Sequence, residues 1–180
     1  MQKKEEILEN FKNGTLSIDE AVNSLQGFED LGHSRVDLNR AERNGAPEVI
    51  FGENKTVEQI QTIMRSMQKH EQNILVTRLN ADSASELLKE FPEAEHHELP
   101  NLLTLKTNDP EPIAHKIAVI CAGTSDLSVA EEARITAEFY GNPVETIYDA
   151  GVAGLHRLLS SLDTIRECRV VIVVAGMEGA

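Results

Sequence analysis

Three short apolar runs separated by amphipathic segments dominate the second half of the chain. The runs predict strands at 117–121, 144–148 and 169–175, and the intervening segments predict helices at 128–140 and 153–162. Strands that are apolar at nearly every position are typical of a sheet buried on both faces, and helical connections allow such strands to run parallel. We therefore expect an α/β fold with a three-layer parallel sheet over residues 116–180.

The first half of the chain has a less regular pattern. Residues 1–26 predict a hairpin of two short helices, the second opened by a capping box at Ser17-x-x-Glu20. Glycines, a proline and many charges predict a loop over 27–55, in which only 48–51 has the pattern of a strand.

A second capping box, Thr56-x-x-Gln59, opens an expected helix over 56–70. Beyond it we expect a strand at 73–77, a helix from the capping box Ser83-x-x-Glu86 to about Phe91, and a strand at 102–105. The predicted organisation is a helical hairpin at 1–26, a small α/β lobe at 27–105, a linker at 106–115 and a partial nucleotide-binding domain at 116–180.

The charge balance argues against two classes of partner. The chain has a net charge of -13 and no Lys/Arg run longer than Lys3-Lys4, so it offers little positive potential for a nucleic acid. Its first residues are charged, and its longest apolar run, 170–175, is too short to cross a bilayer. We expect no nucleic-acid or membrane partner and a cytoplasmic location.

The cysteines and histidines do not suggest a metal centre. Cys121 and Cys168 are the two cysteines of the sequence, and each lies beside or inside an expected strand. His96 and His97 are adjacent and point in different directions, and no set of His, Cys and carboxylate residues has zinc-ligand spacing. We expect free, mostly buried thiols and no metal site.

Ligands of an open parallel sheet bind outside the carboxyl ends of its strands, where helix amino-termini point their amides outward. The first expected strand there runs into Cys121-Ala-Gly-Thr-Ser-Asp126 and a helix with a capping box at Ser128-x-x-Glu131. Gly123 permits a tight turn, and Thr124 and Ser125 offer hydroxyls to an anion. An alternative is that this loop only caps the helix that follows.

The other two strands end in unusual loops as well. His156 and Arg157 follow the second strand and lie off the apolar stripe of their helix, where they could transfer protons or bind phosphate and carboxylate groups. An alternative is a solvent-facing pair. After the third strand, Gly176 and Gly179 suggest close approach of the backbone to a ligand, and Glu178 could orient a ligand hydroxyl or face water.

Common glycine motifs of kinases, dehydrogenases and hydrolases are absent from the sequence. Instead, the segments AGTSDLSVAEEA at 122–133, GLHRLL at 154–159 and VVIVVAGMEGA at 170–180 resemble the PurE-type carboxylases, which have a flavodoxin-like α/β fold. The segment VDLNRAERNGAPEVIFGENKTVEQI at 36–60 and the phrase YDAGVAGLHRLL are similar to one branch, the LarB family of nickel-pincer cofactor biosynthesis.

The resemblance implies an activity. LarB proteins carboxylate the pyridinium ring of nicotinic acid adenine dinucleotide with CO2 or bicarbonate and hydrolyse its phosphoanhydride, giving pyridinium-3,5-biscarboxylic acid mononucleotide and AMP. The family nucleophile is a cysteine in an Asn-Ser-Cys-Ala segment, which this sequence lacks. No tightly bound cofactor is implied, although Mg²⁺ could accompany the substrate diphosphate, and the full-length family forms homo-oligomers, namely octamers.

The resemblance also implies site residues. It assigns catalysis to Ser125, Asp126 and His156, with Asp126 handling a proton. The implied substrate-binding positions in the sheet domain are Gly123, Thr124, Ser125, Arg157, Gly176, Glu178 and Gly179. In the N-terminal lobe, a cation-rich loop adds Arg40, Arg43 and Lys55 as candidates for the dinucleotide's phosphates or carboxylate, with surface solvation as the alternative.

Two other functions stay open. One is a purine-pathway aminoimidazole ribonucleotide carboxylase, although the His-Arg pair lacks the Thr-Pro that usually follows it in those enzymes. The other is a non-catalytic nucleotide-binding module. The chain ends at Ala180 directly after a strand and a glycine turn, which we interpret as a C-terminally incomplete sheet, so this module could be an inactive, truncated fragment.

Overall fold

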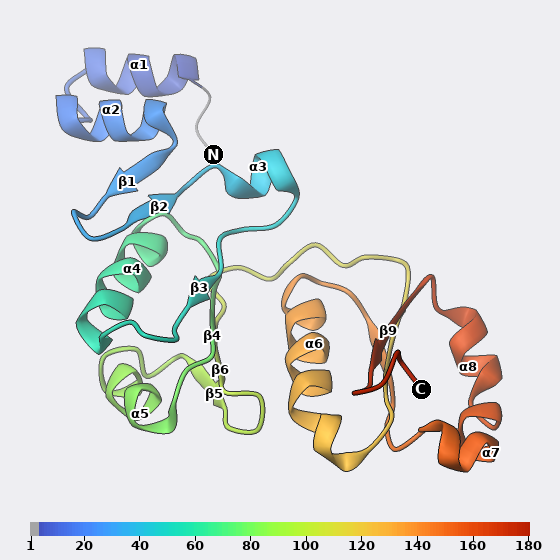
Figure 1. The fold of residues 1–180 in the computed structure, drawn as a ribbon. Coiled ribbons are helices and arrows are strands. Elements are labelled where there is room, and N and C mark those ends of the chain that lie inside the picture. The colour runs from blue at the N-terminus through green and yellow to red at the C-terminus, as the bar shows by residue number, and fades with distance from the viewer. Residues whose placement is uncertain (1–3) are drawn as a thin grey trace.

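A computed structural model describes residues 4–180, apart from the side chain of residue 42. The described chain forms a two-stranded, a four-stranded and a three-stranded sheet in this order along the sequence. Figure 1 shows a helical hairpin at one extremity, the four-stranded sheet in the middle and the three-stranded sheet at the other extremity. This arrangement is mixed α/β, as expected, with one wholly parallel sheet.

The N-terminal hairpin consists of α1 (Lys4–Lys12) and α2 (Ile18–Gln26). Its predicted segment begins at residue 1, and residues 1–3 lie outside the described chain. The predicted capping box is confirmed, because the Ser17 side chain accepts from the Glu20 N–H and the Glu20 carboxylate accepts from the Ser17 N–H at 2.9 Å. Two otherwise unpaired amides at the start of α2 are thereby satisfied.

The prediction of a loop over 27–55 was wrong in part. This segment holds a small antiparallel ribbon, β1 (Phe28–Asp30) with β2 (Arg35–Asp37), and then α3 (Arg40–Asn44), none of which was expected. The strand pattern at 48–51 is confirmed in β3 (Ile50–Phe51). The ribbon turns because the Asp30 carboxylate accepts from the Gly32 N–H at 2.9 Å, and it is anchored by Val36, which is 1% exposed. Three-residue strands are too short to give a periodic signal.

The four-stranded sheet has the order β3-β4-β6-β5. Its further elements are α4 (Val57–Lys69), β4 (Ile74–Thr77), α5 (Ala81–Glu90), β5 (Glu95–His97) and β6 (Leu102–Leu105). The Thr56 capping box is confirmed, whereas the predicted Ser83 box was wrong, because α5 is capped by Asn80, whose side chain accepts from the Ser83 N–H. The edge strand β5 was not predicted.

The three-stranded sheet contains β7 (Ile117–Cys121), β8 (Val144–Ile147) and β9 (Val170–Val174), all parallel, in the order β8-β7-β9. Its helices are α6 (Leu127–Phe139), α7 (Leu155–Leu159) and α8 (Leu162–Glu167). Val119 and Cys121 of β7 pack toward α6, and Ala118 and Ile120 pack toward α7 and α8. The expected three layers are therefore present.

The single helix predicted at 153–162 was wrong in its length. A 3-10 turn, η2 (Val152–Gly154), precedes α7, and α8 begins only at Leu162. The Ser160 hydroxyl donates to the Arg157 carbonyl at 2.7 Å at the break between α7 and α8. Such hydroxyl-to-backbone bonds compete with the helical pattern.

Helix α6 packs against both of the larger sheets. Ile135 and Phe139 contact Leu75 of β4 and Leu102 of β6, while Ala130 contacts the β7 face described above. Figure 1 shows α6 between the two sheets. The predicted linker, 106–115, contains no helix or strand.

None of the helices within residues 4–180 is both long enough and apolar enough to cross a lipid bilayer.

Truncation of Leu75 to alanine should loosen the contact between the four-stranded sheet and α6. Leu75 is 0% exposed, so Leu75→Ala is expected to lower the free energy of unfolding by about 2–5 kcal/mol in urea titrations. Leu99 is 55% exposed, and Leu99→Ala should change it by less than about 0.5 kcal/mol. Equal effects of the two substitutions would contradict this account of α6.

Candidate functional site

The three strands of the parallel sheet end at the same edge, and the loops that follow them make one surface. We call them the site loops: residues 122–126 after β7, 148–154 after β8 and 175–180 after β9. Their backbones are tied together, because the Gly151 N–H donates to the Ala122 carbonyl and the Ala122 N–H donates to the Val174 carbonyl, each at 3.0 Å. Ligand sites of parallel sheets lie at this edge.

The first site loop leads into α6 through the 3-10 turn η1 (Thr124–Asp126). The Asp126 carboxylate accepts from the Gly123 N–H at 2.9 Å and so closes the turn. Thr124 and Ser125 are exposed. Their hydroxyls therefore face solvent at the start of a helix, where an anionic group is favoured.

The predicted capping box at Ser128 and Glu131 was wrong. The N-cap of α6 is Asp126, which makes no side-chain cap bond within α6 itself, but its carboxylate accepts from the N–H of Gly123, the N-cap of the 3-10 turn that leads into α6. The alternative that this loop only caps the helix therefore stays open. The Glu131 carboxylate instead accepts from Tyr148 and from the Arg134 guanidinium. The Ser-x-x-Glu pattern specifies only two residues, so it can also occur where no capping box forms.

The second site loop holds Arg157 in a defined position. Its guanidinium pairs with the Asp149 carboxylate and lies across Gly154, where an added Cβ would be 2.5 Å from the Arg157 Nε. Asp149 itself has a left-handed backbone, with φ of 56°. His156 is exposed beside this pair, and no hydrogen bond to its ring is present among the described residues. Arg157 thus has a carboxylate partner from its own chain.

The third site loop is the most exposed of the three. Gly176, Glu178 and Gly179 are all exposed, and Glu178 and Gly179 have left-handed φ values of 45° and 78°. The Ala180 N–H closes the turn by donating to the Met177 carbonyl at 2.8 Å. A Cβ added at Gly176 would meet nothing within 4 Å.

An apolar cavity of about 240 Å³ lies between these loops. It is lined by Ile120, Ala122, Ala150, Val152, Leu155, Leu158, Val173, Gly179 and Ala180. Residues from all three site loops contribute to this lining, with Val173 from β9 and Leu155 and Leu158 from α7. Its size falls below the roughly 300–1,000 Å³ usual for drug-sized ligands, so it suits one ring of a larger ligand.

Of the three N-terminal cations, Arg43 and Lys55 have partners within their own lobe, and Arg40 lies away from the site loops of the same chain. Arg43 pairs with Asp37 and lowers the pKa of that carboxyl, and the Lys55 Nζ donates to the Phe51 carbonyl at 2.8 Å. Burial raises the pKa of Tyr140, and the charge of Arg40 opposes that rise, which places Arg40 near the carboxyl end of α6. The site loops lie at the opposite end of this helix, about 20 Å away for 13 residues.

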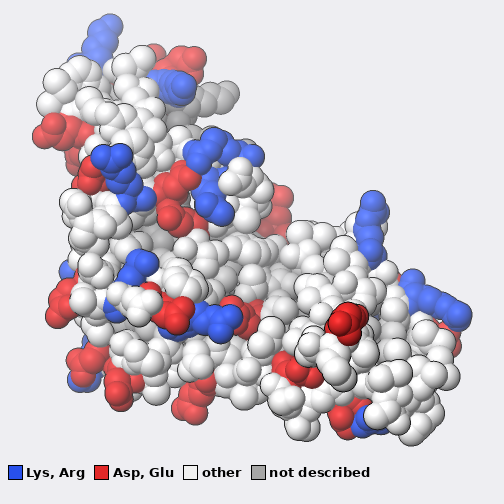
Figure 2. All heavy atoms as spheres, viewed as in Figure 1, with Lys and Arg blue, Asp and Glu red and all other residues white. Residues whose placement is uncertain are grey.

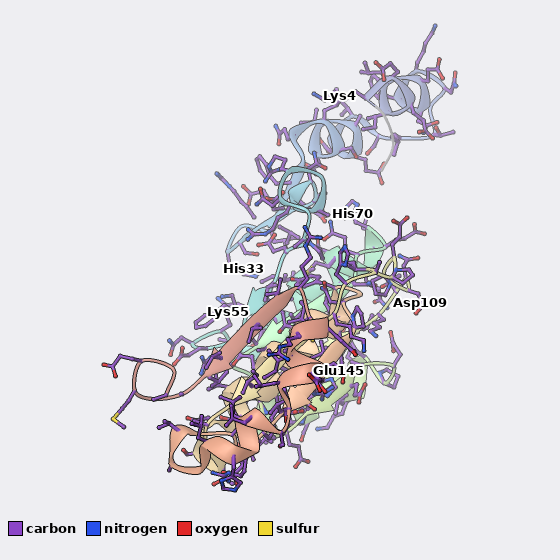
Figure 3. All side chains as sticks on the ribbon, turned by 90° about the vertical axis from the view of Figure 1, so that its right-hand side faces the viewer. Lys4, His33, Lys55, His70, Asp109 and Glu145 are labelled. Atoms are coloured by element: carbon purple, nitrogen blue, oxygen red, sulfur yellow. The ribbon has the colours of Figure 1, made fainter. Side chains whose placement is uncertain are left out.

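Figures 2 and 3 show how charged side chains are distributed over the molecule. Figure 2 shows Lys and Arg side chains interspersed with Asp and Glu over the N-terminal part, without one continuous basic patch on the visible face. In Figure 3, Lys55 lies between Lys4 of the hairpin and Glu145 of β8 along the length of the molecule.

Sequence reasoning missed a polar pocket between the four-stranded sheet and α6. It measures about 230 Å³ and is lined by Glu95, His97, Thr104, Lys106, Arg134, Ile135, Glu138 and Phe139. The His97 Nε2 lies 3.0 Å from the Thr104 hydroxyl, and burial lowers the pKa of His97. His97 was not selected from the sequence because it is adjacent to His96, and only the fold shows that His97 faces α6.

The residues described here, 4–180, contain no group of three His, Cys, Asp or Glu side chains placed to hold a metal ion.

Two comparisons place the chain among known proteins. The family model described as the LarB/PurE-like N-terminal domain matches residues 28–108, which run from β1 to just beyond β6. A protein of Methanocaldococcus jannaschii, described as uncharacterized, is 34% identical over 183 residues, covering 94% of this chain and 71% of that protein. The second match thus extends over the parallel sheet and the site loops as well.

Two glycines of the second site loop should respond differently to alanine. A Cβ at Gly151 would lie 2.9 Å from the Ala122 carbonyl oxygen, which is backbone, so Gly151→Ala should cost about 1–3 kcal/mol of unfolding free energy. At Gly154 the obstacle is the flexible end of Arg157, so Gly154→Ala should displace the guanidinium from Asp149 and cost less than about 1 kcal/mol. Urea unfolding measures both values, and a larger loss for Gly154→Ala would refute this geometry.

Proposed function

The chain belongs to the LarB/PurE-like family, and from this premise we propose that it serves as a pyridinium-3,5-biscarboxylic acid mononucleotide synthase. Its substrates would be nicotinic acid adenine dinucleotide and CO2 or bicarbonate. The reaction adds a carboxyl group to the pyridinium ring and hydrolyses the phosphoanhydride to release AMP. The product would enter the synthesis of a nickel-pincer cofactor.

The observation that supports this proposal is the apolar cavity bordered by the three site loops. Its alanine, valine and leucine lining suits the flat pyridinium ring, while Arg157 offers a planar guanidinium to a phosphate or carboxylate of the same ligand. The exposed hydroxyls of Thr124 and Ser125 lie at the start of α6, where a second anionic group would be stabilised. A ring flanked by anionic groups is the chemistry of a nicotinate nucleotide.

Ring carboxylation requires a nucleophile. Its addition makes a ring carbon enamine-like, that carbon bonds to CO2, a ring proton leaves to a base, and the nucleophile then departs. We assign the proton to the Asp126 carboxylate or His156, both of which lie in the site loops or directly after them. Anionic ligands would compete with Asp149 for Arg157.

Neither cysteine is placed to act as that nucleophile. Cys121 is 0% exposed and packs toward α6 within the sheet. Cys168 lies just before the amino end of β9, at the edge of the sheet opposite the site loops, and burial raises the pKa of its thiol. Covalent catalysis of the family type therefore requires a thiol from outside residues 1–180, whereas binding of the dinucleotide does not.

No tightly bound cofactor is part of the proposal. Two carboxylates of the site loops are already engaged, Asp126 by the Gly123 N–H and Asp149 by Arg157, which leaves the exposed Glu178. This donor set does not fit a resident divalent cation, so Mg²⁺ would enter only together with the substrate diphosphate. We also propose a homo-oligomer, which the exposed Val170, Val171 and Val173 of the edge strand β9 support.

A second candidate is a nucleotide-binding module without catalysis. The placement of Cys121 and Cys168 away from the cavity favours it, because the site then has the means to bind but not to add to the ring.

Labelled bicarbonate distinguishes these functions. We would compare the 180-residue chain with a form extended by a family segment that contains Asn-Ser-Cys-Ala, each with nicotinic acid adenine dinucleotide, and detect AMP and labelled product by mass spectrometry. Both proteins should bind the dinucleotide, Arg157→Ala should weaken binding about tenfold or more, and only the extended form should give labelled mononucleotide.

Three other outcomes of these assays would point to a different function or mechanism. An extended form that binds the dinucleotide but makes no product would favour the non-catalytic module. Carboxylation of aminoimidazole ribonucleotide in its place would assign the chain to the purine pathway, and product from the 180-residue chain would show that no further thiol is needed.

A further inference from the structure

Glu131 has a role in the structure that its sequence context did not suggest. It does not cap α6, and its side chain is 19% exposed, although it lies one turn into a helix whose acidic residues would usually face water. Its two carboxylate oxygens face Arg134 on the same helix and Tyr148 at the end of β8. A partly buried carboxylate that accepts hydrogen bonds from two side chains indicates a specific contact that holds those side chains in place.

The contact is well suited to hold Tyr148. The Arg134 guanidinium reaches Glu131 with its Nε at 3.0 Å from Oε1 and its Nη2 at 2.7 Å from Oε2, a bidentate arrangement. The hydrogen bonds from Arg134 lower the pKa of Glu131 although burial opposes them, so the carboxylate stays ionised. Burial, followed by the bond to Glu131, raises the pKa of Tyr148, so its hydroxyl keeps the proton that it donates.

Tyr148 is the first residue of the second site loop. Asp149, which follows it, holds Arg157, and the next two amides, of Ala150 and Gly151, donate to the Cys121 and Ala122 carbonyls at 3.0 Å. The backbone of the loop is therefore fixed from the β7 side. The Tyr148 hydroxyl is its attachment to α6.

We propose that Glu131 is a positioning residue for anion binding: through the Tyr148 hydroxyl it fixes the start of the second site loop and thereby sets Asp149 and Arg157 to receive a phosphate or carboxylate group of the ligand. This inference deepens the proposed function, since it rests on Arg157 as the contact to the anion. It does not depend on the identity of the ring or on carboxylation.

Arg134 provides a matched control. Its other partner is Glu138, whose Oε2 lies 2.6 Å from the Arg134 Nη1. Glu138 is on the same helix and 43% exposed, and no hydrogen bond joins it to Tyr148 among the described residues. Removal of Glu138 thus takes away an ion pair of Arg134 without touching the link to the site loop.

The test measures binding of inorganic pyrophosphate by isothermal titration calorimetry, with the thermal unfolding midpoint recorded for every variant. Tyr148→Phe removes only the hydroxyl, and we expect it to weaken pyrophosphate binding about three- to tenfold, in line with loss of one hydrogen bond to a charged group. Glu131→Ala should weaken binding at least as much, the double variant no more than the worse single one, and Glu138→Ala less than about twofold.

The variant Arg157→Ala separates positioning from a general loss of structure. In that background, Tyr148→Phe should have no further effect on pyrophosphate affinity, because the group that it positions is gone. An equal further loss there, an effect of Glu138→Ala as large as that of Glu131→Ala, or wild-type affinity in Tyr148→Phe would overturn the proposal.

The pyrophosphate-binding test of the positioning role can fail or succeed independently of the test for carboxylase activity. If the wild-type chain does not bind pyrophosphate, Arg157 is not an anion contact and the positioning role is wrong, whatever the labelled-bicarbonate assay gives. If the positioning result holds and no carboxylation is found, the site binds nucleotides without this reaction.

Discussion

The packing of α6 between two sheets is the interaction on which the rest of the structure depends. One side of this helix contacts Leu75 and Leu102 of the four-stranded sheet, and the other contacts Val119 and Cys121 of the parallel sheet. Since a helix ordinarily buries one stripe, a helix that buries two joins its neighbours into one body. The amino end of α6 carries the first site loop, and Glu131, one turn into the helix, makes the contact to the second. Movement of α6 would therefore displace both of these loops.

Three carboxylates at or beside the site have partners before a ligand arrives. Asp126 accepts from a backbone amide, Asp149 pairs with Arg157, and Glu131 binds Arg134 and Tyr148. Preorganised groups cost little further ordering when a ligand binds, although the ligand must replace Asp149 at the guanidinium. The apolar cavity beside them contributes the rest, because a ring that leaves water gains free energy without needing a partner for each atom.

Local features of the sequence predicted the fold well where the stabilising contacts are themselves local. The capping boxes at Ser17 and Thr56 and the apolar strands of the parallel sheet were confirmed, and with them the edge at which the site loops meet. The ribbon of β1 and β2 and the edge strand β5 were missed, because three-residue strands form only when a distant partner pairs with them.

The Glu131–Tyr148 hydrogen bond could not be predicted for the same reason. It joins residues 17 positions apart, and their contact exists only once α6 lies on β8. The roles of Ser125, His156, Arg157 and the N-terminal cations stay predictions.

The account rests on ligand binding at the three site loops, which amide chemical shifts test most directly. Titration of the isotopically labelled chain with nicotinic acid adenine dinucleotide should shift the amide signals of residues 122–126, 148–157 and 175–180 in a saturable way, and leave those of the distant hairpin α1–α2 unchanged. Shifts confined to the polar pocket between the four-stranded sheet and α6 or to residues 35–55, or no saturable shift at all, would contradict a nucleotide site at the carboxyl edge of the parallel sheet.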